Sequence, residues 1–208
     1  MIIQTLKSFI QLGFSCQLCG IDQQQNHRLC QDCWSMLPRP QSNIIVRQNR
    51  EIYICYDYCF PIDRIIHLYK YEQKLHFQQL LSHSLVQLKL KRFNAIVPMP
   101  ISSERLAYRG YNQMLIIANL LSKQLKIPVW QPVIRSAQHS QKGLTRSERI
   151  ENIEDQFIPT FSERKKYRQV LIIDDVVTTG SSVHALALAL EKLGCEKIQI
   201  ACLAAAQV

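Results

Sequence analysis

The sequence lacks several features that would set it apart from ordinary globular proteins. It has only 6 glycines among 208 residues, no internal repeat and no low-complexity segment. No apolar run approaches the ~18 residues that a membrane-spanning helix needs. Hydrophobic residues make up 47% of the chain, which is too large a share for an intrinsically disordered protein. The length suits one α/β domain of about 150 residues with a small appendage.

The amino end also lacks the parts of a secretory signal peptide. Residues 1–14 carry apolar side chains at helical spacing, but polar side chains interrupt them, and neither a hydrophobic core region nor a cleavage site follows. This pattern favours an amphipathic helix over a signal peptide. We therefore expect a cytoplasmic protein without a membrane span.

Acidic residues are few compared with basic ones. The chain has 25 Lys and Arg but 16 Asp and Glu, giving a formal charge of +9 that is spread along its length. Such a balance favours polyanionic partners, either nucleotide phosphates or nucleic acid. A basic surface without such a partner has the same composition, so the charge alone does not decide between them.

Four of the eight cysteines form two CxxC pairs, which we predict to be the ligands of a structural zinc ion: Cys16, Cys19, Cys30 and Cys33. Disulfides are disfavoured in a reducing cytoplasm, and a redox CxxC normally occurs singly beside a βαβ unit. Four protein ligands would leave no open coordination position for catalysis. The other cysteines share no ligand spacing, and we expect them in the core: Cys55, Cys59, Cys195 and Cys202.

Two prolines at 38 and 40 divide the chain into an N-terminal helix with the zinc module, residues 1–40, and a larger domain, residues 41–208. In the larger domain, apolar patterns predict helices over residues 64–90, 111–125 and 183–193. They predict strands over residues 51–58, 94–100, 129–134, 168–174 and 197–203. This alternation is typical of an α/β fold with a mostly parallel sheet and helices on both faces.

The most informative segment is residues 170–183, where an apolar strand leads into two acids and a loop rich in hydroxyl groups. Asp174 and Asp175 fall at the carboxyl end of the strand, where α/β sheets bind ligands. The Thr-Thr-Gly-Ser-Ser loop, residues 178–182, then offers hydroxyls and backbone N–H groups at a helix N-terminus. This arrangement predicts a phosphate site.

This segment resembles the signature of type I phosphoribosyltransferases. The resemblance implies that Asp174 and Asp175 bind the ribose hydroxyls of phosphoribosyl pyrophosphate (PRPP), directly or beside Mg²⁺. It implies that the 5′-phosphate is bound by Thr178, Thr179, Gly180, Ser181 and Ser182.

Further segments are similar to the ComF family over nearly the whole chain: the CxxC pairs, Val97-Pro-Met-Pro100, Arg105, Arg109-Gly-Tyr-Asn-Gln113, Gln141, Leu144, Arg149 and Asn152. Arg105 and Arg109 are then candidates for neutralising the pyrophosphate, because Arg suits phosphate geometry. A hydrogen-bond network at a helix start would explain Arg109 and Gln113 equally well.

Two segments concern the loop that closes over the ligand in this fold. Lys142, Arg146 and Arg149 lie where that loop is expected, but they also suit a plain charged surface. Residues 68–74 resemble the Lys-Tyr stretch of the family without its following Gly, and the loop at residues 138–139 lacks the expected Thr.

Two functions fit these residues. The ComF resemblance implies handling of imported single-stranded DNA in natural transformation, with PRPP as a ligand and the competence machinery as a partner. The alternative is an active transferase that moves phosphoribosyl from PRPP to a nitrogen acceptor, with Mg²⁺ and Arg side chains stabilising the departing pyrophosphate. Tyrosines beside basic residues suit base stacking or core packing equally: Tyr69, Tyr71, Tyr108 and Tyr111. No recognisable nucleobase pocket identifies an acceptor.

Overall fold

The computed structural model describes residues 14–25, 27–136, 156–160 and 167–207. The expected helix over residues 1–14, apart from Phe14, lies outside these ranges. So does the expected basic loop, with Gln141, Lys142, Leu144, Arg146, Arg149 and Asn152. Among the described residues, no helix is both long and apolar enough to cross a membrane.

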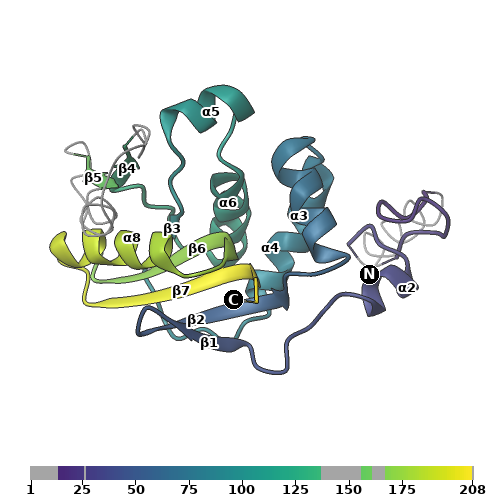
Figure 1. Cartoon of the computed structure of the whole chain (residues 1–208), viewed down its shortest axis with the longest axis horizontal. Coiled ribbons are helices and arrows are strands. Elements are labelled where there is room, and N and C mark those ends of the chain that lie inside the picture. The colour runs from purple at the N-terminus through teal and green to yellow at the C-terminus, as the bar shows by residue number, and fades with distance from the viewer. Residues whose placement is uncertain (1–13, 26, 137–155, 161–166, 208) are drawn as a thin grey trace.

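A five-stranded sheet forms the centre of the larger domain, in the order β1-β2-β7-β6-β3 (Figure 1). The strands are β1 (Ile44–Arg47), β2 (Arg50–Asp57), β3 (Ala95–Pro98), β6 (Gln169–Val177) and β7 (Lys197–Ala205). Only β1 runs antiparallel to its neighbour, and the other three pairings are parallel. The predicted α/β fold with a mostly parallel sheet is therefore confirmed.

Helices cover both faces of this sheet. They are α3 (Ile62–Tyr71), α4 (Gln78–Val86), α6 (Gln113–Leu125) and α8 (Ser181–Lys192), with a 3-10 turn at Leu75–Phe77. The short helix α5 (Ser103–Arg109) has no buried residue and lies away from the sheet (Figure 1). Every residue of β6 from Val170 to Ile173 is buried, although alternate side chains of a strand point to opposite faces. The crossover from β6 to β7 runs across the sheet in the opposite direction to that from β2 to β3. Right-handed crossovers then place α8 on one face, and α3 and α4 on the other.

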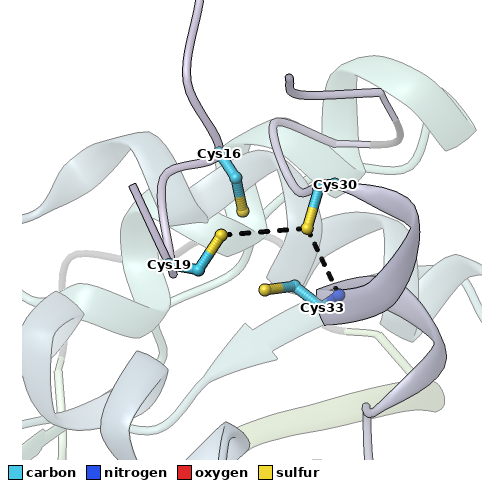
Figure 2. A group of neighbouring side chains, drawn as sticks. All are labelled: Cys16, Cys19, Cys30 and Cys33. Carbon is cyan, nitrogen blue, oxygen red and sulfur yellow. Dashed lines mark hydrogen bonds between the residues drawn. The ribbon is translucent and has the colours of Figure 1, made fainter. Parts of the chain in front are cut away.

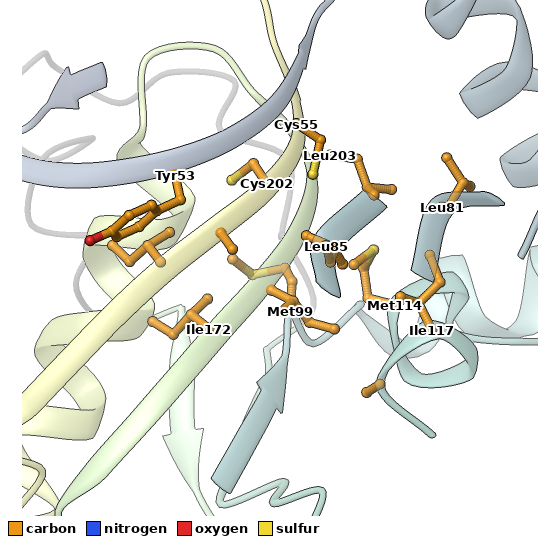
Figure 3. Packing of buried hydrophobic residues seen from close by; sticks show 14 of the residues in the cluster. Tyr53, Cys55, Leu81, Leu85, Met99, Met114, Ile117, Ile172, Cys202 and Leu203 are labelled. Carbon is orange, nitrogen blue, oxygen red and sulfur yellow. The ribbon is translucent and has the colours of Figure 1, made fainter. Parts of the chain in front are cut away.

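The core between the sheet and helices α4 and α6 is apolar (Figure 3). Leu81 and Leu85 of α4 and Met114 and Ile117 of α6 are buried in it. A buried hydrogen bond of 2.7 Å between Tyr56 Oη and Ser84 Oγ joins β2 to α4. Of the four cysteines expected in the core, three are buried there: Cys55, Cys195 and Cys202.

Cys59 is exposed, so the prediction that it packs in the core is wrong. It lies two residues beyond the end of β2, where the chain has left the sheet and turns toward α3.

The sheet differs from the sequence prediction in three places. Strands β6 and β7 both continue past their predicted ends, to Val177 and Ala205, because the last two residues of one pair with the last two of the other. Strand β1 was not predicted, and its hairpin turn at Gln48 and Asn49 has positive φ at both residues, as a type I′ turn requires.

Residues 129–134 do not form one strand. Val129 makes a single parallel bridge to Ile96, and after Pro132 the chain forms β4 (Val133–Arg135). Strand β4 pairs antiparallel with β5 (Phe157–Pro159) in a separate two-stranded sheet. Proline lacks the N–H that a continuing strand would donate, which explains the break.

Candidate functional site

The two acids of β6 lie at the carboxyl ends of the parallel strands but differ in their partners. Asp175 is buried, and its Oδ2 accepts from Lys70 Nζ at 2.9 Å and from Gln113 Nε2 at 2.9 Å. Its Oδ1 accepts from the backbone N–H of Val176 at 2.7 Å. Both carboxylate oxygens of Asp175 are therefore bound by the protein itself.

Asp174 has fewer partners. Its Oδ1 accepts from the backbone N–H of Asp175 at 2.9 Å, and its Oδ2 has no hydrogen-bond partner within the described ranges. Burial and the neighbouring Asp175 carboxylate raise the pKa of Asp174 to about 7. A bound cation would favour the charged form of this carboxylate, so Asp174 is the acid of the pair with an oxygen free for a metal ion or a ribose hydroxyl.

Lys70 is a site residue that the sequence prediction missed. It lies in the last turn of α3, and its side chain is 18% exposed. Although burial opposes its charge, the Asp175 carboxylate beside it raises the pKa of Lys70. The one signal in the sequence was the Lys-Tyr stretch of residues 68–74, which indicated a family likeness but no role.

The start of α6 holds this acid network in place. Tyr69 Oη donates to the backbone carbonyl of Gln113 at 2.9 Å, and Tyr111 Oη donates to the carbonyl of Tyr69. Asn112 caps α6, its Oδ1 accepting from Met114 N at 2.9 Å. The ends of α3 and α6 are thus tied together next to Asp175.

The predicted phosphate loop lies directly before α8. Gly180 has φ +81° and precedes the first turn, which begins with Ser181 and Ser182. Thr178 and Thr179 are exposed, and Thr179 Oγ1 lies 2.9 Å from Ser181 Oγ. Hydroxyls and free N–H groups therefore gather at the N-terminus of a 12-residue helix, where the helix dipole favours an anion.

The β1–β2 hairpin packs against this loop, which the sequence did not indicate. Arg47 Nε donates to the carbonyl of Thr178 at 3.3 Å, and Gln48 Nε2 donates to the carbonyl of Thr179 at 3.5 Å. A Cβ added at Gly180 would lie 2.7 Å from Arg47 Cβ. Glycine is therefore required at this position by its positive φ and by the close approach of the hairpin.

The two arginines proposed for pyrophosphate have different surroundings. Arg109 Nη1 donates to Gln113 Oε1 at 3.1 Å, and its guanidinium lies 4.8 Å from the ring centre of Tyr71. The helix-start network considered for Arg109 and Gln113 is therefore present, and through Gln113 it reaches Asp175. Arg105 is exposed on α5, where its backbone N–H donates to Ser102 Oγ, and its guanidinium makes no hydrogen bond within the described ranges.

Arg135 is a further cation near the acids that the sequence prediction missed. It ends β4, and its Nη2 donates to Gln156 Oε1 at 3.0 Å. Burial and the positive charge of Arg105 lower the pKa of Arg135, whereas the Asp174 carboxylate raises it. Arg105, Arg135 and Asp174 therefore lie close enough for their charges to interact.

Of the tyrosines considered for base stacking, only two are exposed. Tyr69 is buried and Tyr111 is half-buried, so both belong to the packing around α3 and α6. Tyr71 is exposed with Arg109 over its ring, and Tyr108 on α5 is 84% exposed.

The four predicted zinc ligands converge (Figure 2). Their sulfurs all lie within 4.8 Å of one another, and Cys19 Sγ is 3.9 Å from Cys30 Sγ. A tetrahedral ion with Zn–S bonds of about 2.3 Å needs sulfurs about 3.8 Å apart. The donor set and its size therefore fit a structural zinc ion.

Backbone groups favour the thiolate form of Cys16, whereas burial raises the pKa of Cys33 and, against the opposing effect of the Cys33 N–H, that of Cys30. Burial opposes ionisation of Cys16, but backbone N–H groups of Cys19, Cys30 and Leu18 lower its pKa to about 6. Cys30 caps α2 (Gln31–Ser35) and accepts from the N–H of Cys33 at 3.4 Å. Thiolates are the form that binds zinc.

The comparisons agree with this geometry. The model of the phosphoribosyl transferase domain family matches residues 114–207, which contain α6 except its first residue, both acids and the phosphate loop. With the mostly parallel sheet described above, this match defines a protein of the type I phosphoribosyltransferase fold, preceded by a four-cysteine cluster.

Similar proteins of known name show to which family of this fold the chain belongs. The chain is 30% identical to competence protein F of Haemophilus influenzae, over 94% of this chain and 84% of that protein. It is 28% identical to competence protein ComFC of Bacillus subtilis, over 88% of this chain and 73% of that protein. It is 26% identical to DNA utilization protein YhgH of Escherichia coli K12, over 90% of this chain and 82% of that protein. The chain belongs to the ComF family.

Proposed function

We propose that this protein binds PRPP and handles single-stranded DNA imported during natural transformation, acting in the cytoplasm. PRPP binding is supported mainly by one observation: Asp174, near the end of β6, is followed by a hydroxyl-rich loop at the N-terminus of α8. The DNA role is supported by the relatives named for competence and DNA utilization.

In this proposal the phosphate loop binds the 5′-phosphate through backbone N–H groups and the hydroxyls of Thr178, Thr179, Ser181 and Ser182. The free oxygen of Asp174 accepts from a ribose hydroxyl or binds Mg²⁺. When bound, Mg²⁺ supplies positive charge to the pyrophosphate. Arg105, Arg109 and Arg135 supply further positive charge to the same group.

Asp175 has a different part in this proposal. Because both of its oxygens already accept hydrogen bonds, a ribose hydroxyl or Mg²⁺ must displace Lys70 or Gln113 to reach it. We propose that Asp175 mainly positions Lys70 and Gln113 beside the ligand.

The pocket is tested by titrating PRPP with Mg²⁺ into the protein in a calorimeter. Asp174→Asn should weaken binding at least about tenfold, because it removes the charge that a metal ion or hydroxyl would meet. Glu51→Gln, which removes an exposed carboxylate of β2, is the matched control. Equal affinity in the two variants would refute the pocket.

We also propose that residues 1–40 form a zinc-dependent module and that residues 41–208 form the phosphoribosyltransferase-like domain. The zinc ion is structural in this proposal, because all four tetrahedral positions have cysteine ligands. The spacing and convergence of the four sulfurs support this.

The DNA role is tested by fluorescence anisotropy of a short labelled single-stranded DNA, with and without Mg²⁺ and PRPP. We expect binding that weakens with salt and changes when the ligand is added, since the chain carries a net charge of +9. Absence of binding at low salt would overturn the DNA role.

Phosphoribosyl transfer is the second candidate function, favoured by the match to the phosphoribosyl transferase domain. Its readout is release of pyrophosphate from PRPP in the presence of a nitrogen acceptor. The C1–O bond to pyrophosphate breaks and a C1–N bond forms, so release must depend on the acceptor. The competence machinery is expected as a partner only if the protein has the DNA role.

A further inference from the structure

A cavity of about 290 Å³ lies between the cysteine module and the face of the sheet covered by α4. Its lining includes Trp34 of α2, Arg39 of the linker, Tyr56 of β2, His83 of α4, and Gln87, which directly follows α4. None of these residues belongs to the phosphate loop or the acid network. The volume is near the lower end of the range for small-ligand sites and suits one nucleobase with part of its sugar.

Planar groups form one wall of this cavity. The Arg39 guanidinium lies 5.5 Å from the ring centre of Trp34 and 5.9 Å from that of Tyr56. The His27 ring does not line the cavity but packs behind this wall, with its centre 5.3 Å from that of Trp34 and 4.0 Å from that of His83. Aromatic rings and guanidinium planes are the groups on which proteins stack unpaired bases.

The charge of the cavity selects for an anion. No acidic side chain lines it, and in the described part of the chain Arg39 forms no ion pair. Arg39 is exposed at the edge of the cavity, where it can meet a phosphate of a bound strand. A neutral ring compound would not form an ion pair with Arg39, whereas a nucleotide offers a base for stacking and a phosphate for the guanidinium.

Side-chain amides supply hydrogen-bonding groups at the cavity. Asn43 also lines it and donates through Nδ2 to the carbonyl of Ile54 at 2.9 Å, which leaves its Oδ1 as an acceptor. Gln87 Nε2 lies 3.3 Å from His83 Nε2, and Gln87 is exposed, so its Oε1 is a second acceptor. Such oxygens can accept from the N–H groups on the edge of a base.

We propose that this cavity is a base-binding subsite for single-stranded DNA, in which one unstacked base packs against the wall of Trp34 and Arg39. The proposal rests on the DNA role proposed above and assigns it a site distinct from the PRPP pocket. The cysteine module then serves DNA binding directly, because it contributes Trp34 to the wall.

The test compares two probes of equal charge by fluorescence anisotropy on the full-length, zinc-loaded protein. One is labelled (dT)8 and the other is an abasic phosphodiester octamer. Because stacking of one base contributes about tenfold in affinity, we expect (dT)8 to bind about tenfold more tightly. Trp34→Leu should remove most of that preference and leave the affinity for the abasic probe unchanged.

Two further variants keep the test valid if Trp34→Leu disturbs the folding of the cysteine module. Gln87→Ala changes the exposed residue directly after α4 and should reduce the preference for (dT)8 about threefold, as loss of one hydrogen bond predicts. Lys123→Gln removes an exposed charge from α6 and should leave the preference unchanged. Zinc content and melting temperature are measured for each variant.

The outcomes separate this subsite from the DNA role. If both probes bind with equal affinity, the protein binds phosphates alone and the base subsite is overturned while the DNA role stands. The subsite is also overturned if folded Trp34→Leu and Gln87→Ala keep the full preference for (dT)8. Binding of neither probe at low salt would overturn the DNA role itself.

Discussion

The Nζ of Lys70 lies 2.9 Å from Asp175 Oδ2, and the side-chain amide of Gln113 donates to the same oxygen. Three elements, α3, α6 and β6, therefore meet at one carboxylate. Both oxygens of Asp175 are already bound, whereas Asp174 keeps one oxygen without a partner among the described residues, so the two adjacent acids have unequal surroundings. The Lys70–Asp175 ion pair leads to one prediction, and the raised pKa of Asp174 leads to another.

Lys70→Met should destabilise the protein by about 3 kcal/mol, because it leaves the buried Asp175 carboxylate without its cation. Adding Asp175→Asn should restore most of that loss, since the uncompensated charge is then gone. The free energies of unfolding are measured by urea titration. Equal stability of the single and double variants would show that Lys70 acts by packing and not by its charge.

The raised pKa of Asp174 predicts a dependence of stability on pH. Between the ordinary Asp pKa of about 3.9 and the folded value of about 7, the folded state binds more protons than the unfolded state. The contribution of this group to the free energy of unfolding therefore falls as the pH rises through that window.

Asp174→Asn should remove this contribution. We expect the variant to match the wild type near pH 4 and to be about 4 kcal/mol more stable at pH 8 in the absence of ligand. Urea titrations of both proteins between pH 4 and pH 8 provide the measurement. Parallel stability curves would mean that Asp174 ionises normally in the folded protein.

Gly180→Ala should destabilise the phosphate loop by about 2 kcal/mol, because the residue has a positive φ and its new Cβ would lie 2.7 Å from Arg47 Cβ. Gly194→Ala is the matched control, since Gly194 also has positive φ, of +95°, but open space around its Cβ position. The difference between the two variants in urea titrations isolates the close approach of the hairpin. We expect Gly180→Ala also to weaken PRPP binding, and Gly194→Ala to leave it unchanged.

The parts of the molecule that the sequence predicted are those with strong local patterns. Residues 170–173 are a continuous apolar run, so β6 and the loop after it were located correctly apart from the end of the strand. The CxxC pairs predicted that four sulfurs meet, because their spacing alone limits the metal geometry.

The unpredicted contacts join residues that are distant in the sequence. Gln113 and Asp175 are 62 residues apart, and Arg47 and the carbonyl of Thr178 are 131 apart. Neither contact leaves a local pattern of spacing, because sheet order and helix placement bring the residues together. Strands β4 and β5 have three residues each, which is too short for alternation to show.

Removal of zinc should unfold the cysteine module. Because structural zinc contributes its binding energy to folding, a chelator should lower the melting temperature of the module and expose Trp34, which is half-buried and follows Cys33 in α2. Cys19→Ser should reproduce this effect and lower the zinc content below one ion per chain. Cys59→Ser is the matched control, because both cysteines are exposed but only Cys19 belongs to the cluster. A melting curve that the chelator leaves unchanged, with no zinc released, would rule out the zinc site and leave hydrogen bonds and packing to hold the four thiols together.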